Sequence, residues 1–131
     1  VDLTRAILAG EPVDLGMGWV NLIWQGDAND LIARSVTLAA SPPLVLNVTG
    51  PETVSIRALA EQFGRIFGKQ PVLAGKEQPD ALLGNAARAH ALFGLPRVPL
   101  AQVIAWTAAW VRSGGSTLAK PTHFNVRDGK F

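Results

Sequence analysis

The stretch LVLNVTGP at residues 44–51, followed by Ser55, indicates most clearly how this chain folds. Residues 44–48 form an apolar run broken only by Asn47, which is typical of a strand covered on both faces, so we expect the innermost strand here. Residues 49–51 then predict a turn, and Ser55 predicts the N-cap of a helix. Apolar residues at helical spacing follow and end before Gly68: Ile56, Leu59, Ala60, Phe63, Ile66 and Phe67. A buried strand, a turn and an amphipathic helix together predict a mixed α/β fold.

The rest of the chain predicts further short elements of both kinds. Alternating or β-branched residues at 11–15, 19–24 and 71–74 predict strands, and helical spacing predicts helices at 4–9, 27–39, 86–93 and 99–112. Asp27 and Asn85 stand where N-caps are expected, because their side chains can accept from first-turn amides. We therefore expect about four short strands and four to five helices.

Composition limits the kinds of partner. The 131 residues suffice for one core, and 12 basic and 10 acidic residues are scattered rather than clustered, which argues against a nucleic-acid partner. The most apolar stretch, residues 100–111, is shorter than the roughly 20 residues of a membrane-spanning helix, so we expect no membrane partner. The absence of cysteine suits the reducing cytoplasm. Because the chain begins at Val1 without an initiator methionine, we interpret it as a piece of a longer protein.

Three short segments carry a family resemblance. WQGDA at 24–28 after a strand, LNVTGP at 46–51 before the Ser55 helix start, and the helix stop LFGLP at 92–96 recur in this order in the extended short-chain dehydrogenases. The closing segments KPTHF at 120–124 and RDGKF at 127–131 resemble the tail of bacterial NAD-dependent epimerase/dehydratases. The chain thus resembles the C-terminal, substrate-side portion of such an enzyme, from residue 1 to residue 131.

The resemblance implies a two-part enzyme that oxidises a sugar or nucleotide-sugar transiently. In this family an N-terminal Rossmann half holds NAD or NADP through a glycine fingerprint, and a YxxxK pair performs acid/base chemistry. This chain has no GxGxxG or GxxGxxG and no tyrosine, so we assign it no catalytic and no cofactor-binding residue and expect it to be catalytically incompetent alone. By the resemblance, residues 28–48 return to the edge of the missing Rossmann sheet, and 114–131 form a tail.

The resemblance also places candidate substrate contacts. In UDP-galactose epimerase-like relatives a diphosphate-binding arginine falls at Val20 or Asn21, and a second falls near Lys76, which could act as a point charge. We expect the substrate cleft to be lined by segments 11–21 and 74–78. The proposed substrate-binding residues are therefore Asp14, Leu15, Asn21 and Lys76.

Histidine and aspartate side chains could in principle support other chemistry. His90 and His123 are too far apart in sequence, and too poor in neighbouring carboxylates, to predict a metal site, so we place them on a helix surface and in the tail. Asp27 and Asp30 could form a catalytic carboxylate pair, but helix capping and the helix dipole explain them more simply.

The four tryptophans also have two interpretations. Trp19 and Trp24 should point to opposite faces of a strand, and we favour core packing over cleft lining for both. Trp106 and Trp110 lie one helical turn apart, which favours core or lobe-interface packing over a platform for stacking bases.

An alternative function is a free-standing ligand-binding or dimerisation module that has lost its cofactor domain. In both interpretations the partner expected by resemblance, the N-terminal Rossmann half, is missing from this chain. We expect self-association in isolation through residues 44–48 or 19–24, because an uncovered apolar strand is a template for pairing.

Overall fold

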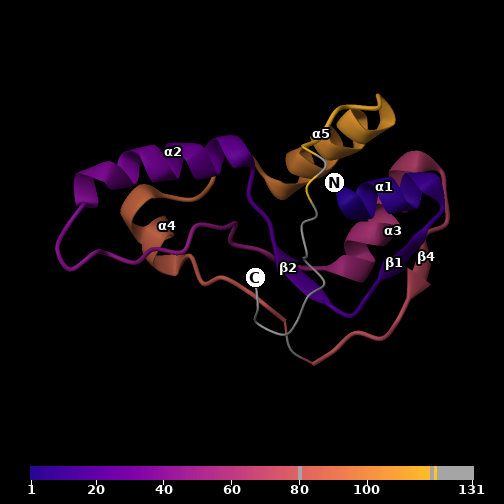
Figure 1. The fold of residues 1–131 in the computed structure, drawn as a ribbon, viewed down its shortest axis with the longest axis horizontal. Helices are drawn as coiled ribbons and strands as arrows, with labels where there is room; N and C mark the ends of the chain where they lie inside the picture. Colours follow the sequence, from indigo (N-terminus) through magenta and orange to yellow (C-terminus); the bar gives the residue numbers. More distant parts are fainter. Residues whose placement is uncertain (80, 119, 121–131) are drawn as a thin grey trace. The chain divides into compact units, whose positions relative to one another are not determined.

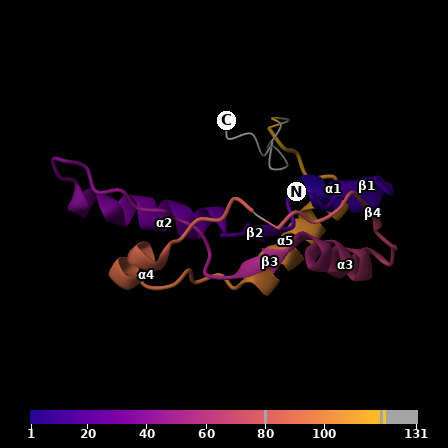
Figure 2. The same cartoon turned by 90° about the horizontal axis from the view of Figure 1, so that it is seen from below.

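The computed structural model describes residues 1–79, 81–118 and 120, so the expectations for segments 120–124 and 127–131, His123 included, fall largely or wholly outside the described residues. The chain divides into two compact units: unit 1 comprises Val1–Val20, Val54–Leu82 and the chain from Ile104 onwards, and unit 2 comprises Asn21–Thr53 and Leu83–Val103. Figures 1 and 2 together label the α-helices and strands of both units. In the part of the chain that is described, no helix combines the length and hydropathy needed to cross a membrane.

Unit 1 is built around two parallel strands, β1 (Pro12–Asp14) and β4 (Val72–Ala74). Their register pairs Pro12 with Val72 and Asp14 with Ala74, and both strands coincide with predicted ones. The helix α1 (Asp2–Ala9) ends at Gly10, whose φ of 78° is a left-handed conformation that glycine adopts without strain. Helices α1 and α3 (Ile56–Phe67) pack against each other next to this strand pair (Figures 1 and 2).

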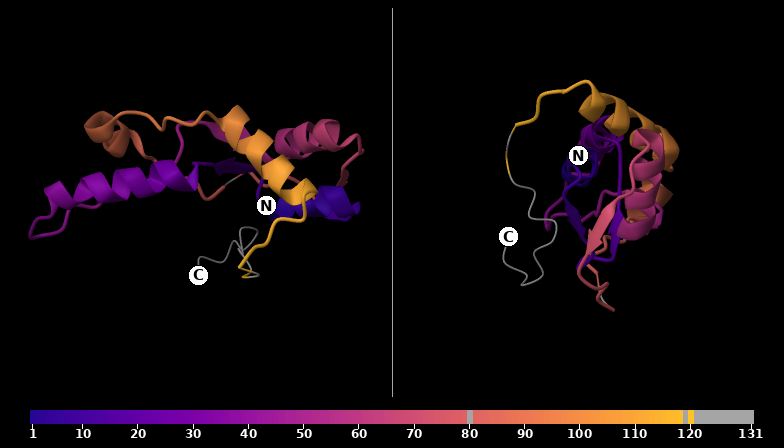
Figure 3. Two further views of the ribbon diagram at one scale, coloured as in Figure 1. Left: turned by 90° about the horizontal axis from the view of Figure 1, so that it is seen from above. Right: turned by 90° about the vertical axis from the view of Figure 1, so that its right-hand side faces the viewer.

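The helix α3 confirms the clearest sequence pattern. The Ser55 hydroxyl accepts from the Ala58 amide at 3.3 Å, as an N-cap should, and Gly68 ends the helix with a φ of 66°. Helix α5 (Leu100–Arg112) ends beside α3, as Figure 3 shows. There the Arg112 guanidinium donates to the Ile66 carbonyl and lies over the Phe67 ring at 5.3 Å. The buried apolar residues of unit 1 are Ile7, Val13, Leu15, Met17, Ile56, Leu59, Ala60, Phe63, Ile104, Ala108 and Val111.

Unit 2 contains two packed helices, α2 (Gln25–Ser35) and α4 (Ala87–Phe93), with a short 3-10 helix η1 (Val36–Leu38) after α2. Arg34 joins them by donating to the Phe93 carbonyl at 3.0 Å while its guanidinium lies over the Phe93 ring. The strands β2 (Trp19–Asn21) and β3 (Thr53–Ser55) form a second two-stranded sheet, and the division between the units falls within these two strands. The strand predicted at 19–24 is therefore shorter, and β3 was not predicted.

The expectation of an innermost strand at residues 44–48 is wrong. This segment has no regular secondary structure, since no strand in the described residues pairs with it to form a ladder. Its side chains alternate in burial: Leu44, Leu46 and Val48 are half-buried, whereas Val45 is 78% exposed. The apolar run is thus covered on one side only.

The expected caps of α2 and α4 are displaced. Helix α2 begins two residues before Asp27, so Asp27 lies in its first turn, buried, and its Oδ2 accepts from the Val98 amide at 2.8 Å. The Asp27 carboxylate therefore holds the segment after α4 rather than capping its own helix. Asn85 Oδ1 does accept from the Ala87 amide at 3.0 Å, but Ala86 is the N-cap residue of α4.

The tryptophans are more exposed than predicted. Trp19, Trp24, Trp106 and Trp110 are all between 39% and 50% exposed, so none is a core residue. The Trp110 indole covers Gly115 and its Nε1 donates to the Ser116 carbonyl at 3.2 Å. Core packing is therefore the wrong interpretation for Trp19 and Trp24.

Candidate functional site

The candidate site lies where β1 and β4 end. Because the strands are parallel and Asp14 pairs with Ala74, the loops 15–18 and 75–78 leave the same edge of the sheet. Ligands of parallel sheets bind outside the carboxyl ends of the strands, where such loops converge. We call these two loops, together with Asp14 at the end of β1, the carboxyl-end site.

Asp14 and Gly75 meet closely at this edge. The Asp14 Oδ1 accepts from the Gly16 amide at 2.8 Å, which fixes the turn after β1. Gly75 has a φ of 74°, and a Cβ at this position would lie 3.0 Å from Asp14 Oδ1. A glycine is therefore needed here both for its backbone conformation and for the space that the carboxylate occupies.

Three of the four proposed substrate contacts flank the carboxyl-end site. Asp14 and Lys76 are exposed on its two loops. Leu15 is also there, and its amide donates to the Ala74 carbonyl at 2.9 Å, but its side chain is 1% exposed and belongs to the core. Asn21 lies in unit 2, where its Nδ2 donates to the Glu52 carbonyl at 3.1 Å and its Oδ1 accepts from the Gly84 amide at 2.9 Å. Its amide therefore bridges two backbone segments of that unit.

Two charged residues of the site were missed by the sequence reasoning. Arg57, the second residue of α3, donates from Nε to Glu77 Oε1 at 3.0 Å. The Glu77 side chain also lies against Gly18, whose carbonyl accepts from the Ile56 amide at 2.9 Å. The 20 residues between Arg57 and Glu77 carry no local pattern that predicts this pair. The start of α3 and both loops are thereby held together.

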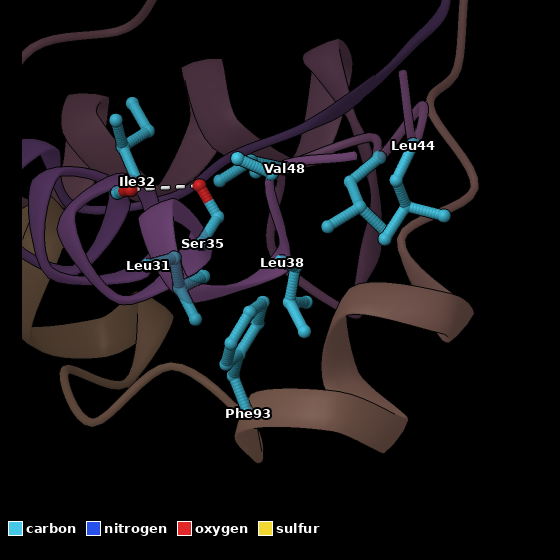
Figure 4. Close-up of a pocket in the computed structure, with 9 residues that line it drawn as sticks. Leu31, Ile32, Ser35, Leu38, Leu44, Val48 and Phe93 are labelled. Atoms are coloured by element: carbon cyan, nitrogen blue, oxygen red, sulfur yellow. Dashed lines mark hydrogen bonds between the residues drawn. The ribbon is translucent and has the colours of Figure 1, made fainter. Parts of the chain in front are cut away.

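A hollow lies in unit 2 and is lined mainly by apolar side chains. It encloses about 240 Å³ and is lined by Leu31, Ile32, Ser35, Leu38, Ala39, Leu44, Leu46, Val48 and Phe93. Figure 4 shows Leu31, Leu38 and Phe93 gathered on one side of it. The Ser35 hydroxyl donates to the Ile32 carbonyl at 2.7 Å, so this hydroxyl is already engaged within its own helix. The hollow offers apolar surface and no group suited to acid/base work.

The aspartates and the described histidine have structural partners. Asp30 accepts from Arg34 at 3.3 Å and lies 3.8 Å from Arg97, and Asp27 binds the Val98 amide, so both carboxylates are engaged. His90 is half-buried, and its Nε2 lies 3.0 Å from the Thr49 carbonyl, so it is not the plain surface residue that was expected. Within the described ranges, no three His, Cys, Asp or Glu residues group as metal ligands would.

The chain matches no family model, and no curated protein matches it in sequence. Its fold is similar to solved structures of nucleotide-sugar epimerases. UDP-glucuronic acid 4-epimerase from Bacillus cereus in complex with NAD matches with a TM-score of 0.68 and 17% identity, over 87% of this chain and 39% of that one. MoeE5 in complex with UDP-glucuronic acid and NAD matches with a TM-score of 0.68 and 22% identity, over 86% and 40%.

A third match supports the same fold assignment. Thermus thermophilus UDP-glucose 4-epimerase in complex with NAD matches with a TM-score of 0.66 and 19% identity, over 85% of this chain and 39% of that one. This chain spans about two-fifths of the length of each of these three proteins. The predicted fold class is confirmed: the chain is mixed α/β with the fold of part of a Rossmann-type epimerase, consistent with the C-terminal portion that the sequence resembles.

Proposed function

We propose that this chain is the substrate-side portion of an NAD-dependent epimerase or dehydratase acting on a nucleotide-sugar by transient oxidation. The observation that carries the proposal is the fold match, which extends over 85–87% of the chain to two UDP-sugar 4-epimerases and to MoeE5, all solved with NAD. One of those proteins is solved with UDP-glucuronic acid as well. The carboxyl-end site is the part of this chain to which we assign substrate binding.

The residues of this chain do not fit a nicotinamide cofactor. A dinucleotide site needs a glycine-rich turn that leads from a strand into a helix, whose N-terminal amides hold the pyrophosphate. Here β1 leads to β2, and β4 leads into the irregular residues 75–79, so neither glycine-bearing loop opens a helix. The connections from β2 to α2 and from β3 to α3 do lead into helices, but they carry no glycine-rich turn. We therefore assign NAD or NADP to residues outside this chain, together with the acid/base chemistry.

Within the carboxyl-end site, the proposed work is binding and orientation. Lys76 is an exposed ammonium that can approach a phosphate group as a point charge. The exposed Asp14 carboxylate can accept hydrogen bonds from sugar or ribose hydroxyls. A ligand held at this edge would be presented by a rigid strand pair rather than by a free loop.

Calorimetric titration of the chain with UDP-glucose, NAD and NADP tests this assignment. We expect UDP-glucose to bind with a dissociation constant of about 1 mM, because only part of the substrate cleft is present, and neither cofactor to bind. Lys76→Ala should abolish the UDP-glucose signal. Arg65→Ala, which removes a cation of α3 outside the two site loops, should leave it unchanged. Micromolar binding of NAD would contradict the assignment.

The alternative, a free-standing ligand-binding or dimerisation module, is favoured by apolar surface in unit 2. Ile32 is 56% exposed and Val36 is 72% exposed on α2, and Val45 projects from the unpaired segment 44–48. Such a surface would be covered by the missing Rossmann half, or in isolation by a second copy of this chain.

We therefore expect the isolated chain to self-associate at micromolar concentration, as light scattering coupled to size-exclusion chromatography would measure. Val45→Lys should shift the population to monomer, because it puts a charge on the exposed apolar surface without disturbing a buried side chain. Thr37→Lys, at an exposed position on η1, provides a control for added charge. A wild-type chain that remains monomeric would exclude self-association.

A further inference from the structure

We propose that Arg57 is an oxyanion-binding residue of the carboxyl-end site, and that Glu77 holds the Arg57 guanidinium in place as an internal competitor of the ligand. The proposal rests on the proposed function, since the ligand group would be the phosphate part of the nucleotide-sugar. It adds a residue that the sequence pattern did not single out and assigns a role to the ion pair.

The first argument is the way in which Arg57 is engaged. Its only hydrogen bond or ion pair within the described residues runs from Nε to Glu77 Oε1, at 3.0 Å. A guanidinium has five N–H donors in a planar fork, so the terminal nitrogens keep donors to offer. The Arg57 side chain is 45% exposed, which leaves those donors accessible. This geometry suits the bidentate recognition of a phosphate oxygen pair.

The second argument is how firmly the pair is placed at the site. Glu77 follows Lys76 directly in the loop after β4, and its Cβ lies 3.4 Å from where a Cβ on Gly18 would be. Gly18 in turn accepts from the Ile56 amide, next to Arg57. The start of α3 is thus fixed to both site loops: the backbone bond from Ile56 reaches the loop after β1, and the side-chain bond from Arg57 reaches the loop that carries Lys76.

The third argument is charge. The carboxyl-end site with Arg57 contains two cations, Arg57 and Lys76, and two carboxylates, Asp14 and Glu77, so its formal charge is zero. A phosphate oxyanion binding to Arg57 would have to share the guanidinium with Glu77 or displace it. Glu77 therefore holds the Arg57 side chain in place but weakens its affinity for an anion. Removing the charge of Glu77 should strengthen anion binding.

Titration of the full chain and its variants with three probes tests this inference. The probes are UDP-glucose, inorganic pyrophosphate and glucose, which separate recognition of the whole ligand from that of its phosphate or sugar part. We expect Arg57→Ala to weaken binding of UDP-glucose and pyrophosphate about tenfold, and Arg57→Lys to weaken it less. Glu77→Gln should strengthen both by about threefold. Arg65→Ala is the matched control and should change neither.

The outcomes separate this inference from the proposed function. If the wild-type chain binds UDP-glucose and Arg57→Ala binds it equally well, Arg57 is not a ligand residue, although the proposed function stands. If Glu77→Gln weakens pyrophosphate binding, Glu77 is no competitor and the inference fails. If glucose binds as tightly as pyrophosphate, the site recognises sugar hydroxyls and the inference also fails. If the wild-type chain does not bind UDP-glucose, both the proposed function and this inference fail.

Melting curves of each variant check that it is folded, because removing an exposed ion pair should scarcely change the melting temperature.

Discussion

Gly50→Ala is expected to lower the free energy of unfolding by about 4 kcal/mol. Gly50 is buried, and a Cβ at this position would lie 1.9 Å from the Leu22 carbonyl oxygen and 3.1 Å from its carbon. The clashing atoms belong to the backbone, so no side-chain rotation relieves the overlap and either the segment after β2 or the turn at 49–51 must move. Urea unfolding followed by tryptophan fluorescence measures the change.

The control for this substitution is Gly84→Ala in the same unit. A Cβ on Gly84 would meet only the Thr49 methyl group, at 3.4 Å, which is ordinary van der Waals contact. We expect a change within about 1 kcal/mol of zero, since alanine also restricts the unfolded chain. Equal stabilities of the two variants would mean that the close approach of residues 22 and 50 is not present in solution.

Phe63→Ala is expected to cost about 3 to 5 kcal/mol in unit 1. Phe63 is 5% exposed at the centre of the apolar face of α3 and stacks against Phe67 with ring centroids 6.3 Å apart. Truncation removes most of a buried ring and leaves a cavity among residues fixed by α1 and α3. Thermal or urea unfolding measures the loss.

Ile66→Ala, three residues further along α3, provides the contrast. Ile66 is 37% exposed, so its truncation removes less buried surface, and a cost of about 1 kcal/mol is expected. If Ile66→Ala were as damaging as Phe63→Ala, the face that α3 buries would be a different one.

Sequence reasoning worked where local chemistry alone determines structure. The cap at Ser55, the apolar stripe of α3 and the left-handed stop at Gly68 depend on residues within one helix and its ends, and all are confirmed. Sequence reasoning failed where the structure of a segment depends on a partner from another part of the chain. Residues 44–48 have the composition of a buried strand, but a strand exists only when another strand supplies its hydrogen bonds. Similarly, the Asp27 carboxylate could cap its own helix, but in the folded chain it accepts from the Val98 amide instead.

The candidate site could be predicted only in part, because some of its residues are brought together by tertiary structure. Asp14 and Lys76 could be proposed only through the family resemblance, which placed the cleft on segments 11–21 and 74–78. The parallel pairing of β1 with β4 then brings both residues to one edge of the sheet. The ion pair of Arg57 with Glu77 required the three-dimensional position of α3, which no spacing in the sequence encodes. Leu15 was proposed as a member of the cleft-lining segment 11–21, but the alternation of side chains along the strand directs it into the core.

The most direct test of the central claim is to map ligand binding residue by residue with amide NMR spectra, using UDP-glucose and NAD in separate titrations of the full chain. If this chain is the substrate side of a nucleotide-sugar enzyme, UDP-glucose should shift the amides of residues 14–18 and 75–78 and NAD should shift none. Shifts caused by NAD at similar concentration, or UDP-glucose shifts confined to the apolar hollow around Leu31 and Phe93, would contradict the account.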